Sequence, residues 1–326
     1  MSIHIGYFGK LATRSDFVKS GEQHALAGLL DAWVDATLAQ LTTNTRWKLH
    51  YDALAPLHFA FVGPHSRHVV AGHMVASGDL SGRRFPFIAM SALEVPAPGT
   101  FLASSPLALA GAWRQMAGLT AAVQDAADPA GALQTVSGAV LDADAVRASH
   151  AGELDAFAAA HDIAALEALL AVDGHRHDVR GILLGIGLLL QPFEWTGSTR
   201  LDRSLALPLP RDPALRPRVA AFWLALVAPF LRRQEVNHHN IELALFMSEL
   251  RGRPTFVIGF AGATPGTLRA VIDPEYGATH LIGFDDVAWV DDMIAHDHAV
   301  RRLSACLAQG SLSLRTAVDL FRETFA

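Results

Sequence analysis

Two segments far apart in the sequence, residues 6–18 and residues 82–87, combine charged and aromatic side chains with glycine. The side chains that single them out are Lys10, Arg14, Asp16, Phe17, Arg83, Arg84 and Phe85. In both segments the charged groups stand between apolar neighbours. Charged groups in such a frame either pair with one another inside the fold or face a partner, so these residues are the candidate scaffold or partner-binding site.

Two interpretations of this candidate site stay open. In the first, Asp16 accepts hydrogen bonds from Arg14, Arg83 or Arg84 and holds the first turn against a strand of a sheet. The planar fork of arginine suits such a pair with a carboxylate. In the second, one or both arginines of the second segment face a groove that receives another protein.

The Gly9-Lys10 pair follows a short apolar strand and therefore needs testing as a phosphate-binding loop. That loop requires a glycine five residues before the second glycine and a Ser or Thr after the lysine. His4 and Leu11 occupy these places. The Gly185-Ile186-Gly187 run also lacks the third glycine of a dinucleotide fingerprint and favours tight packing instead. The sequence therefore predicts neither nucleotide binding nor a bound cofactor.

Histidine and aspartate residues offer a different chemistry, the ligation of a metal ion. The densest cluster comprises Asp285, Asp286, Asp291, Asp292, His296, Asp297 and His298. On a helix, Asp292 and His296 are i, i+4 neighbours and could bind the same ion, which makes a metal-dependent hydrolase the alternative function. Acidic residues near the N-terminal end of a solvated helix explain the same pattern without a metal. We therefore assign no metal ligands from the sequence.

Other histidines fall in smaller groups. His175 and His177 stand in a polar break, and His58, His65, His68 and His73 straddle two predicted strands and their turn. The sequence contains neither a Gly-x-Ser-x-Gly nucleophile elbow nor a His-Glu-x-x-His zinc motif. Cys306, the single cysteine, lies among apolar residues and is expected to pack in the interior. We therefore predict no catalytic residues and no enzymatic activity.

The hydrophobic periodicity predicts a mixture of helices and strands around these residues. Helices are expected at residues 22–41, 107–127, 129–148, 153–172, 219–233, 241–250, 267–272, 285–308 and 311–325. Strands are expected at residues 57–62, 69–76, 85–93 and 255–260, and strand-like sequence returns at residues 179–190. Consecutive strands with short links favour antiparallel pairing.

These elements predict an α/β protein of the α+β kind, with a mainly antiparallel sheet flanked by helices and a helix-rich C-terminal portion. We expect an N-terminal α/β domain at residues 1–125. Residues 126–326 are expected to form a helix-rich C-terminal region with a small strand-containing unit.

Composition limits the functional classes. Hydrophobic residues make up 51% of the 326 residues and charged residues 18%, so there is ample material for a core. The net charge is −6 and no basic stripe is present, which argues against a nucleic-acid surface. The first residues lack a signal peptide, and the apolar runs are too short to span a membrane. With one cysteine, we expect a cytoplasmic protein that does not insert into membranes.

At the two charged segments the sequence resembles the TagF family, also called ImpM, of type VI secretion-associated proteins. The family signature, close to Gly-Lys-Leu-Pro-x-Arg-Gly-Asp-Phe, is matched by Gly9, Lys10, Leu11, Arg14, Asp16 and Phe17. Ala12 and Ser15 replace the proline and the second glycine, Trp33 stands in the following helix, and residues 82–86 match Gly-Arg-Arg-Phe-Pro outright. The resemblance covers residues 3–95 well.

The resemblance implies a non-enzymatic, cytoplasmic accessory protein of a Gram-negative type VI secretion system. TagF-like proteins repress assembly of the system post-translationally, through protein binding. In some systems they work through a forkhead-associated protein, which is therefore a candidate partner. A structural assembly factor is a third alternative to this regulator and to the hydrolase. The resemblance does not extend clearly to the last hundred residues.

Overall fold

The computed structural model describes residues 3–20, 23–196, 202–232, 242–295 and 297–325. The strands are β1 (Ile3–His4), β2 (Gly6–Gly9), β3 (Val18–Lys19), β4 (Leu57–Val62), β5 (His68–Val75), β6 (Phe87–Glu94), β7 (Val140–Leu141), β8 (Ser204–Pro208), β9 (Leu243–Leu250), β10 (Arg253–Gly259) and β11 (Leu281–Gly283). The helices are α1 (His24–Leu41), α2 (Trp47–Asp52), α3 (Pro98–Asp125), α4 (Ala130–Gly138), α5 (Ala143–Arg147), α6 (Ala151–Ala160), α7 (Ile163–Leu170), α8 (Val179–Thr196), α9 (Arg216–Arg232), α10 (Pro265–Ile272), α11 (Pro274–His280), α12 (Ala288–Ile294), α13 (His298–Leu307) and α14 (Leu314–Phe325).

A single large sheet organises the fold. Within the described residues it has nine strands in the order β11-β8-β10-β9-β4-β5-β6-β2-β3. Its pairings are antiparallel except for the parallel pair β11–β8. The predicted class, a mainly antiparallel sheet flanked by helices, is confirmed.

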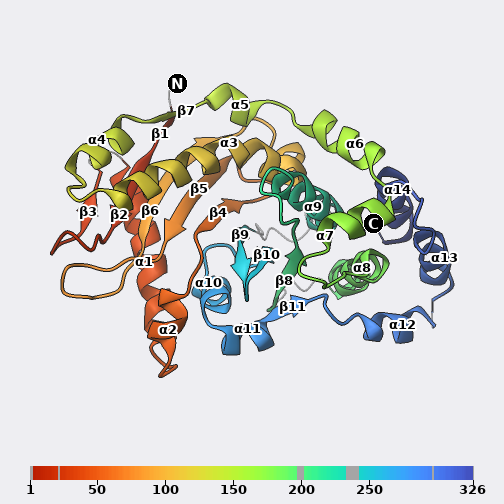
Figure 1. The fold of residues 1–326 in the computed structure, drawn as a ribbon. Helices are drawn as coiled ribbons and strands as arrows, with labels where there is room; N and C mark the ends of the chain where they lie inside the picture. Colours follow the sequence, from red (N-terminus) through yellow and green to blue (C-terminus); the bar gives the residue numbers. More distant parts are fainter. Residues whose placement is uncertain (1–2, 21–22, 197–201, 233–241, 296, 326) are drawn as a thin grey trace.

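Helices cover both faces of this sheet (Figure 1). One face packs against α3, α8 and α9, and the other against α1, α2 and α10. Strand β4 shows how the sequence achieves this. Phe59 and Phe61 belong to the core on the α1 side, whereas Ala60 and Val62 belong to the core on the α3 side. Alternating side chains of a strand point to opposite faces, so both faces of the sheet are apolar.

The pairing of β4 with β9 joins the N-terminal and C-terminal parts of the chain. Ala60 of β4 lies opposite Leu245 of β9, and both side chains are fully buried. Helix α3 of the N-terminal part also packs against α9 of the C-terminal part. The two predicted regions therefore contribute to one continuous sheet, and their treatment as separate domains stays a prediction.

Most predicted elements of the N-terminal part are confirmed, among them α1 and strands β4 to β6. Two predictions in the C-terminal part are wrong. Residues 179–190, expected to be strand-like, belong to helix α8, and residues 243–250 of the expected helix 241–250 form strand β9. Residue 241 lies outside the described residues. The predicted helix 129–148 is divided into α4, β7 and α5.

The wrong prediction for α8 has a physical reason. All side chains between residues 182 and 186 are buried, so no exposed position marks the period of a helix there. Gly187 lies against the Phe325 ring, and a Cβ at this position would overlap that ring. The Gly185-Ile186-Gly187 run therefore serves close packing, as the sequence indicated.

None of the helices within the described ranges is both long and apolar enough to cross a bilayer.

A histidine pair is buried between β4 and β5. His58 and His73 face each other across the strands, with 2.9 Å between their Nδ1 atoms, and His58 stacks on the Trp113 ring. Burial lowers the pKa of His58 to about 4, with a smaller contribution from Arg216. Burial and the neighbouring His58 lower the pKa of His73 to about 3. Both rings are therefore neutral at neutral pH.

This pair predicts a loss of stability in mild acid. The folded-state pKa of each ring lies below its unfolded value of 6.5, so protonation favours the unfolded chain. Stability is fully present above pH 6.5 and should fall by on the order of 2–4 kcal/mol between pH 6.5 and about 4.5. Chemical denaturation across this range measures the loss. The double variant His58→Gln/His73→Gln should flatten the pH dependence, whereas His65→Gln, at an exposed position, should not. An unchanged slope in the double variant would contradict the assignment.

Candidate functional site

Two loops that the sequence singled out lie side by side at one end of the sheet. We call them the paired loops: residues 10–17, between β2 and β3, and residues 77–86, between β5 and β6. They meet because β2 pairs with β6, with Gly9 opposite Phe87. Gly9 has φ of 135°, and a Cβ there would overlap the Pro86 carbonyl. Glycine is therefore required where the two loops begin to diverge from the sheet.

A buried carboxylate, that of Asp79, lies at the centre of the paired loops. Its Oδ2 is 3.0 Å from the Lys10 Nζ and accepts a 2.7 Å hydrogen bond from the Arg83 Nε. Its Oδ1 accepts from the backbone N–H groups of Ser81 and Arg83, each at 3.0 Å. The Asp79 side chain is fully buried and that of Lys10 is only 10% exposed. One carboxylate thus pairs with two cations and shapes the turn.

These contacts control the charge of Asp79. Burial alone would raise the pKa of this carboxyl. The hydrogen bonds from the Arg83 backbone, the Lys10 ammonium and the Arg83 guanidinium outweigh burial and hold the pKa far below its usual range. Asp79 is therefore ionised at any physiological pH.

Further hydrogen bonds join the two loops directly. The Ser77 hydroxyl donates to the Lys10 carbonyl at 2.7 Å, and the Leu80 N–H donates to the Arg14 carbonyl at 2.9 Å. The Arg83 Nη2 donates to the Ser15 carbonyl of the first loop at 3.2 Å. All three donors belong to the second loop and all three acceptors to the first. The paired loops therefore form one structural unit.

The predicted role of Asp16 as the acceptor for the arginines is wrong. Arg84 forms a two-pronged bond with Asp52 of α2, at 2.7 and 2.5 Å, and Arg14 donates to Asp128 at 2.8 Å. Asp16 is exposed and has no hydrogen bond or ion pair with any residue in the described part of the chain. Arg84 and Arg14 therefore pair with carboxylates 32 and 114 residues away, which the spacing of residues cannot reveal, whereas Arg83 pairs with Asp79 four residues before it.

The aromatic residues of the two loops also contact each other. The rings of Phe17 and Phe85 meet edge to face, with centroids 4.8 Å apart, and the Lys10 Nζ lies 5.0 Å from the Phe17 centroid. Phe85 is buried, but Phe17 of the first loop is 49% exposed and Leu80 of the second loop is 68% exposed. The paired loops therefore combine ion pairs in their interior with exposed apolar side chains.

Sequence reasoning missed Asp79 and Leu80. The signal for Asp79 was available, since Ser77-Gly78-Asp79 was recognised as a turn and aspartate commonly accepts from backbone N–H groups two residues further on. Leu80 stands inside that turn, where an apolar residue has no core to enter. An apolar residue at a turn position is a usable sign of an exposed contact surface.

The acidic cluster at residues 285–298 mostly stabilises helices. Asp286 accepts from the N–H of Ala288 at the start of α12, and Asp297 accepts from the first N–H groups of α13. Asp291 pairs with Arg180 of α8 at 2.7 Å. These are the roles of the solvated-helix interpretation.

The proposed pairing of Asp292 with His296 stays a prediction, because His296 lies outside the described residues. Asp292 itself is exposed on α12, and His298 is exposed at the first position of α13. The remaining member of the cluster, Asp285, has a different environment on the wall of a cavity.

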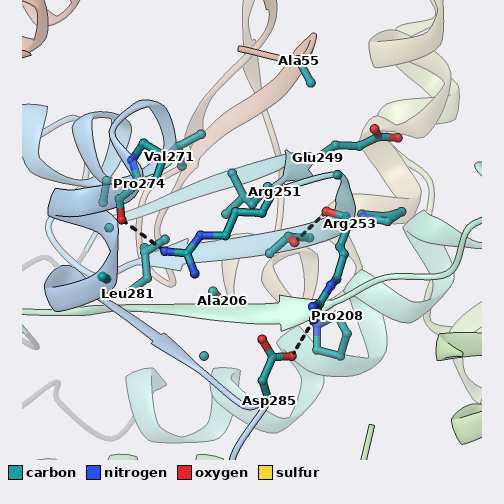
Figure 2. Close-up of a pocket in the computed structure, with 18 of the residues that line it drawn as sticks. Ala55, Ala206, Pro208, Glu249, Arg251, Arg253, Val271, Pro274, Leu281 and Asp285 are labelled. Carbon is teal, nitrogen blue, oxygen red and sulfur yellow. Dashed lines mark hydrogen bonds and ion pairs between the residues drawn. The ribbon is translucent and has the colours of Figure 1, made fainter. Parts of the chain in front are cut away.

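This cavity, of about 700 Å³, lies between the β9–β10 hairpin, β8, α10, α11 and β11. Figure 2 shows Arg251 reaching across it to the Pro274 carbonyl, at 3.2 Å, and Arg253 extending to Asp285, also at 3.2 Å. His177 forms part of the same wall. Burial and the nearby His175 lower the pKa of His177 to about 4.

A protein-family model matches the part of the chain that contains the paired loops. Residues 6–139 match the model of the TagF N-terminal domain, type VI secretion system-associated. The N-terminal part of the chain is thus similar to this type VI secretion-associated domain. The TagF match includes both paired loops and the β2–β6 pairing that brings them together. No curated protein matches the sequence.

One solved structure similar to part of the chain is that of PA0076 from Pseudomonas aeruginosa PAO1. It is 25% identical, with a TM-score of 0.35, over 41% of this chain and 61% of that protein. The chain therefore spans about three fifths of the length of this relative.

Removal of the buried Asp79 carboxylate should destabilise the paired loops. Asp79→Asn preserves the shape but leaves Lys10 and Arg83 without their counter-charge, so the melting temperature at neutral pH should fall by several degrees. In the parent chain the stabilisation is present above the unfolded pKa of 3.8 and is lost as pH falls below it towards the lower folded value.

Thermal and chemical denaturation between pH 7 and 2 test both effects. Asp16→Asn is the matched control, since it removes an exposed carboxylate without partners, and should leave stability unchanged. Equal stability of the two variants would show that Asp79 does not hold the paired loops together.

Proposed function

We propose that the protein is a non-enzymatic, cytoplasmic regulator that represses assembly of a type VI secretion system post-translationally, by binding another protein. The match of residues 6–139 to a type VI secretion-associated domain supports the system in which it acts. The observation that carries protein binding is the paired-loop surface, on which Phe17 and Leu80 are exposed.

The charges of the paired loops favour a scaffold role for some residues and a contact role for others. Lys10 and Arg83 share Asp79, and Arg84 is held by Asp52, so these cations stabilise the loops themselves. They are poor targets for a binding test, because charge reversal there would disturb the fold.

The residues left for the partner are those on the outer side of the loops. Phe17 supplies a rigid aromatic ring, which is the kind of residue that dominates binding energy at protein interfaces. Leu80, whose N–H donates to the Arg14 carbonyl, adds exposed apolar area on the second loop, and Asp16 and the partly exposed Arg14 supply charges of opposite sign. An apolar centre with a polar rim is the usual arrangement of a protein–protein interface.

A forkhead-associated domain protein of the secretion system is the first candidate partner. This proposal follows from the family resemblance. The exposed Phe17 and Leu80 of the paired loops support protein binding as the mode of interaction.

The double variant Phe17→Glu/Leu80→Glu tests this surface. It should abolish co-purification of the partner and raise effector secretion to the level of the deletion strain, because two charges replace the apolar centre of the interface. Met293→Glu is the matched control, since Met293 is 50% exposed on α12 and Phe17 is 49% exposed. The control should retain both binding and repression.

Circular dichroism and thermal melting of the purified variants separate binding from folding. Normal secretion control by a folded double variant would remove the paired loops as the binding surface. The deletion itself tests the regulatory role: a deletion strain in which secretion stops, instead of rising, would identify a structural assembly factor.

A further inference from the structure

Three ligand-type side chains converge at the cavity between the β9–β10 hairpin and β11, far from the paired loops. His175 and His177 come from the segment before α8, and Asp285 comes 110 residues after His175, just after β11. We propose that His175, His177 and Asp285 bind a divalent transition-metal cation of the zinc type. This site is separate from the proposed protein-binding surface and does not depend on it.

The distances between the three groups suit a common ion. The His175 Nε2 lies 3.0 Å from the Asp285 Oδ1, and the His177 Nδ1 lies 3.9 Å from the same oxygen. One ligand atom from each residue falls within 4.8 Å of the other two. Ligands about 2.0–2.1 Å from a tetrahedral zinc ion are about 3.3 Å apart. The three groups therefore need to move by only a fraction of this spacing to share an ion.

The backbone holds each ligand in place. His175 ends a tight turn in which its N–H donates to the Val172 carbonyl and its carbonyl accepts from the Val172 N–H. Two residues further on, His177 precedes Asp178, whose side chain accepts from the Gly181 N–H at the start of α8. These hydrogen bonds constrain the backbone on both sides of the two histidines, so less conformational entropy is lost when the side chains bind an ion.

Asp285 is positioned just as firmly. It follows Phe284, which is buried against α8 at Gly185. The site therefore joins the beginning of α8 to the end of β11, and an ion there would crosslink the edge strand of the sheet to the helix layer.

The His177 ring supplies the observation that points most directly to a ligand. Its side chain is only 8% exposed, and its buried Nδ1 has no hydrogen-bond partner within the described residues. A buried polar atom without a partner costs free energy, so such atoms are rare in folded proteins. A metal ion between His177 and Asp285 would satisfy this nitrogen.

Two imidazoles and one carboxylate favour an ion of the zinc type over calcium or magnesium, which take oxygen ligands almost exclusively. Three protein ligands leave a fourth position of a tetrahedral ion open. His177 and Asp285 both line the cavity, so this fourth position lies next to its interior.

Arg253 occupies part of this site and supplies a distinctive test. Its Nη1 donates to the Asp285 Oδ1 at 3.2 Å, as Figure 2 shows, and its side chain is 45% exposed. The guanidinium neutralises Asp285 and competes with a cation for the same oxygen. Removing this positive charge should therefore tighten metal binding, which a hydrogen-bonded cluster with no metal role would not do.

Isothermal titration of the metal-free full chain with zinc chloride measures the proposal. The parent chain should bind one equivalent, and Asp285→Asn or His177→Ala should weaken binding by at least about tenfold. Arg253→Gln should tighten binding several-fold. Cobalt titration gives an independent readout, because a tetrahedral cobalt site has strong visible absorption bands that the ligand variants should lose.

Matched controls identify adventitious binding. His65→Ala removes an exposed histidine, and Asp292→Asn removes an exposed carboxylate of the acidic cluster. Both should bind zinc as the parent chain does, and weaker binding by either would overturn the assignment. Binding of less than one equivalent by the parent chain, or no tightening in Arg253→Gln, would also overturn it. The arginine variant and the cobalt spectrum of the parent chain decide the question even if a ligand variant fails to fold.

Discussion

The fold depends on the pairing of β4 with β9, because this contact turns two sets of strands into one sheet. Once the strands are continuous, helices must cover both faces, and every central strand becomes apolar on both sides. In β9, for example, Ala244 and Phe246 join one core while Leu243 and Leu245 join the other. The same pairing separates the two candidate sites, since it places β2 and β3 at one end of the sheet and β11 at the other (Figure 1).

This two-sided burial also decides which elements the sequence can predict. Strands β4 to β6 have short links and turn residues on either side, so their existence and antiparallel pairing were predictable. Helix α1 has one buried stripe and shows the period of a helix. By contrast, residues 181–187 of α8 and 243–248 of β9 are buried without a break. A segment without an exposed face has no periodicity to distinguish 3.6 residues per turn from alternation, and both were assigned to the wrong class.

The ion pairs of the candidate sites show the same limit of prediction from the sequence. The sequence identified Lys10, Arg83 and Arg84 as residues to explain, because charged groups in apolar frames need partners. It could not identify Asp52 and Asp128 as the partners of Arg84 and Arg14, since pairing across 32 and 114 residues depends on the topology of the fold. Asp79 lies only four residues from Arg83 and was within reach of a local argument. The same holds for Asp285, which was one of several carboxylates in a cluster until β11 placed it beside His175.

The separation of the two sites has a physical consequence for regulation. The paired loops belong to strands β2, β3, β5 and β6, whereas the metal-ligating residues surround β8, β10 and β11. A ligand at one site has no direct contact with the other, so any coupling would have to pass through the buried centre of the sheet. Packed interiors have few alternative arrangements, and the β4–β9 pair is buried on both faces. The sheet therefore favours two independent sites, with the proposed metal site at the edge that ends in β11 and the proposed contact surface of the paired loops at the other edge.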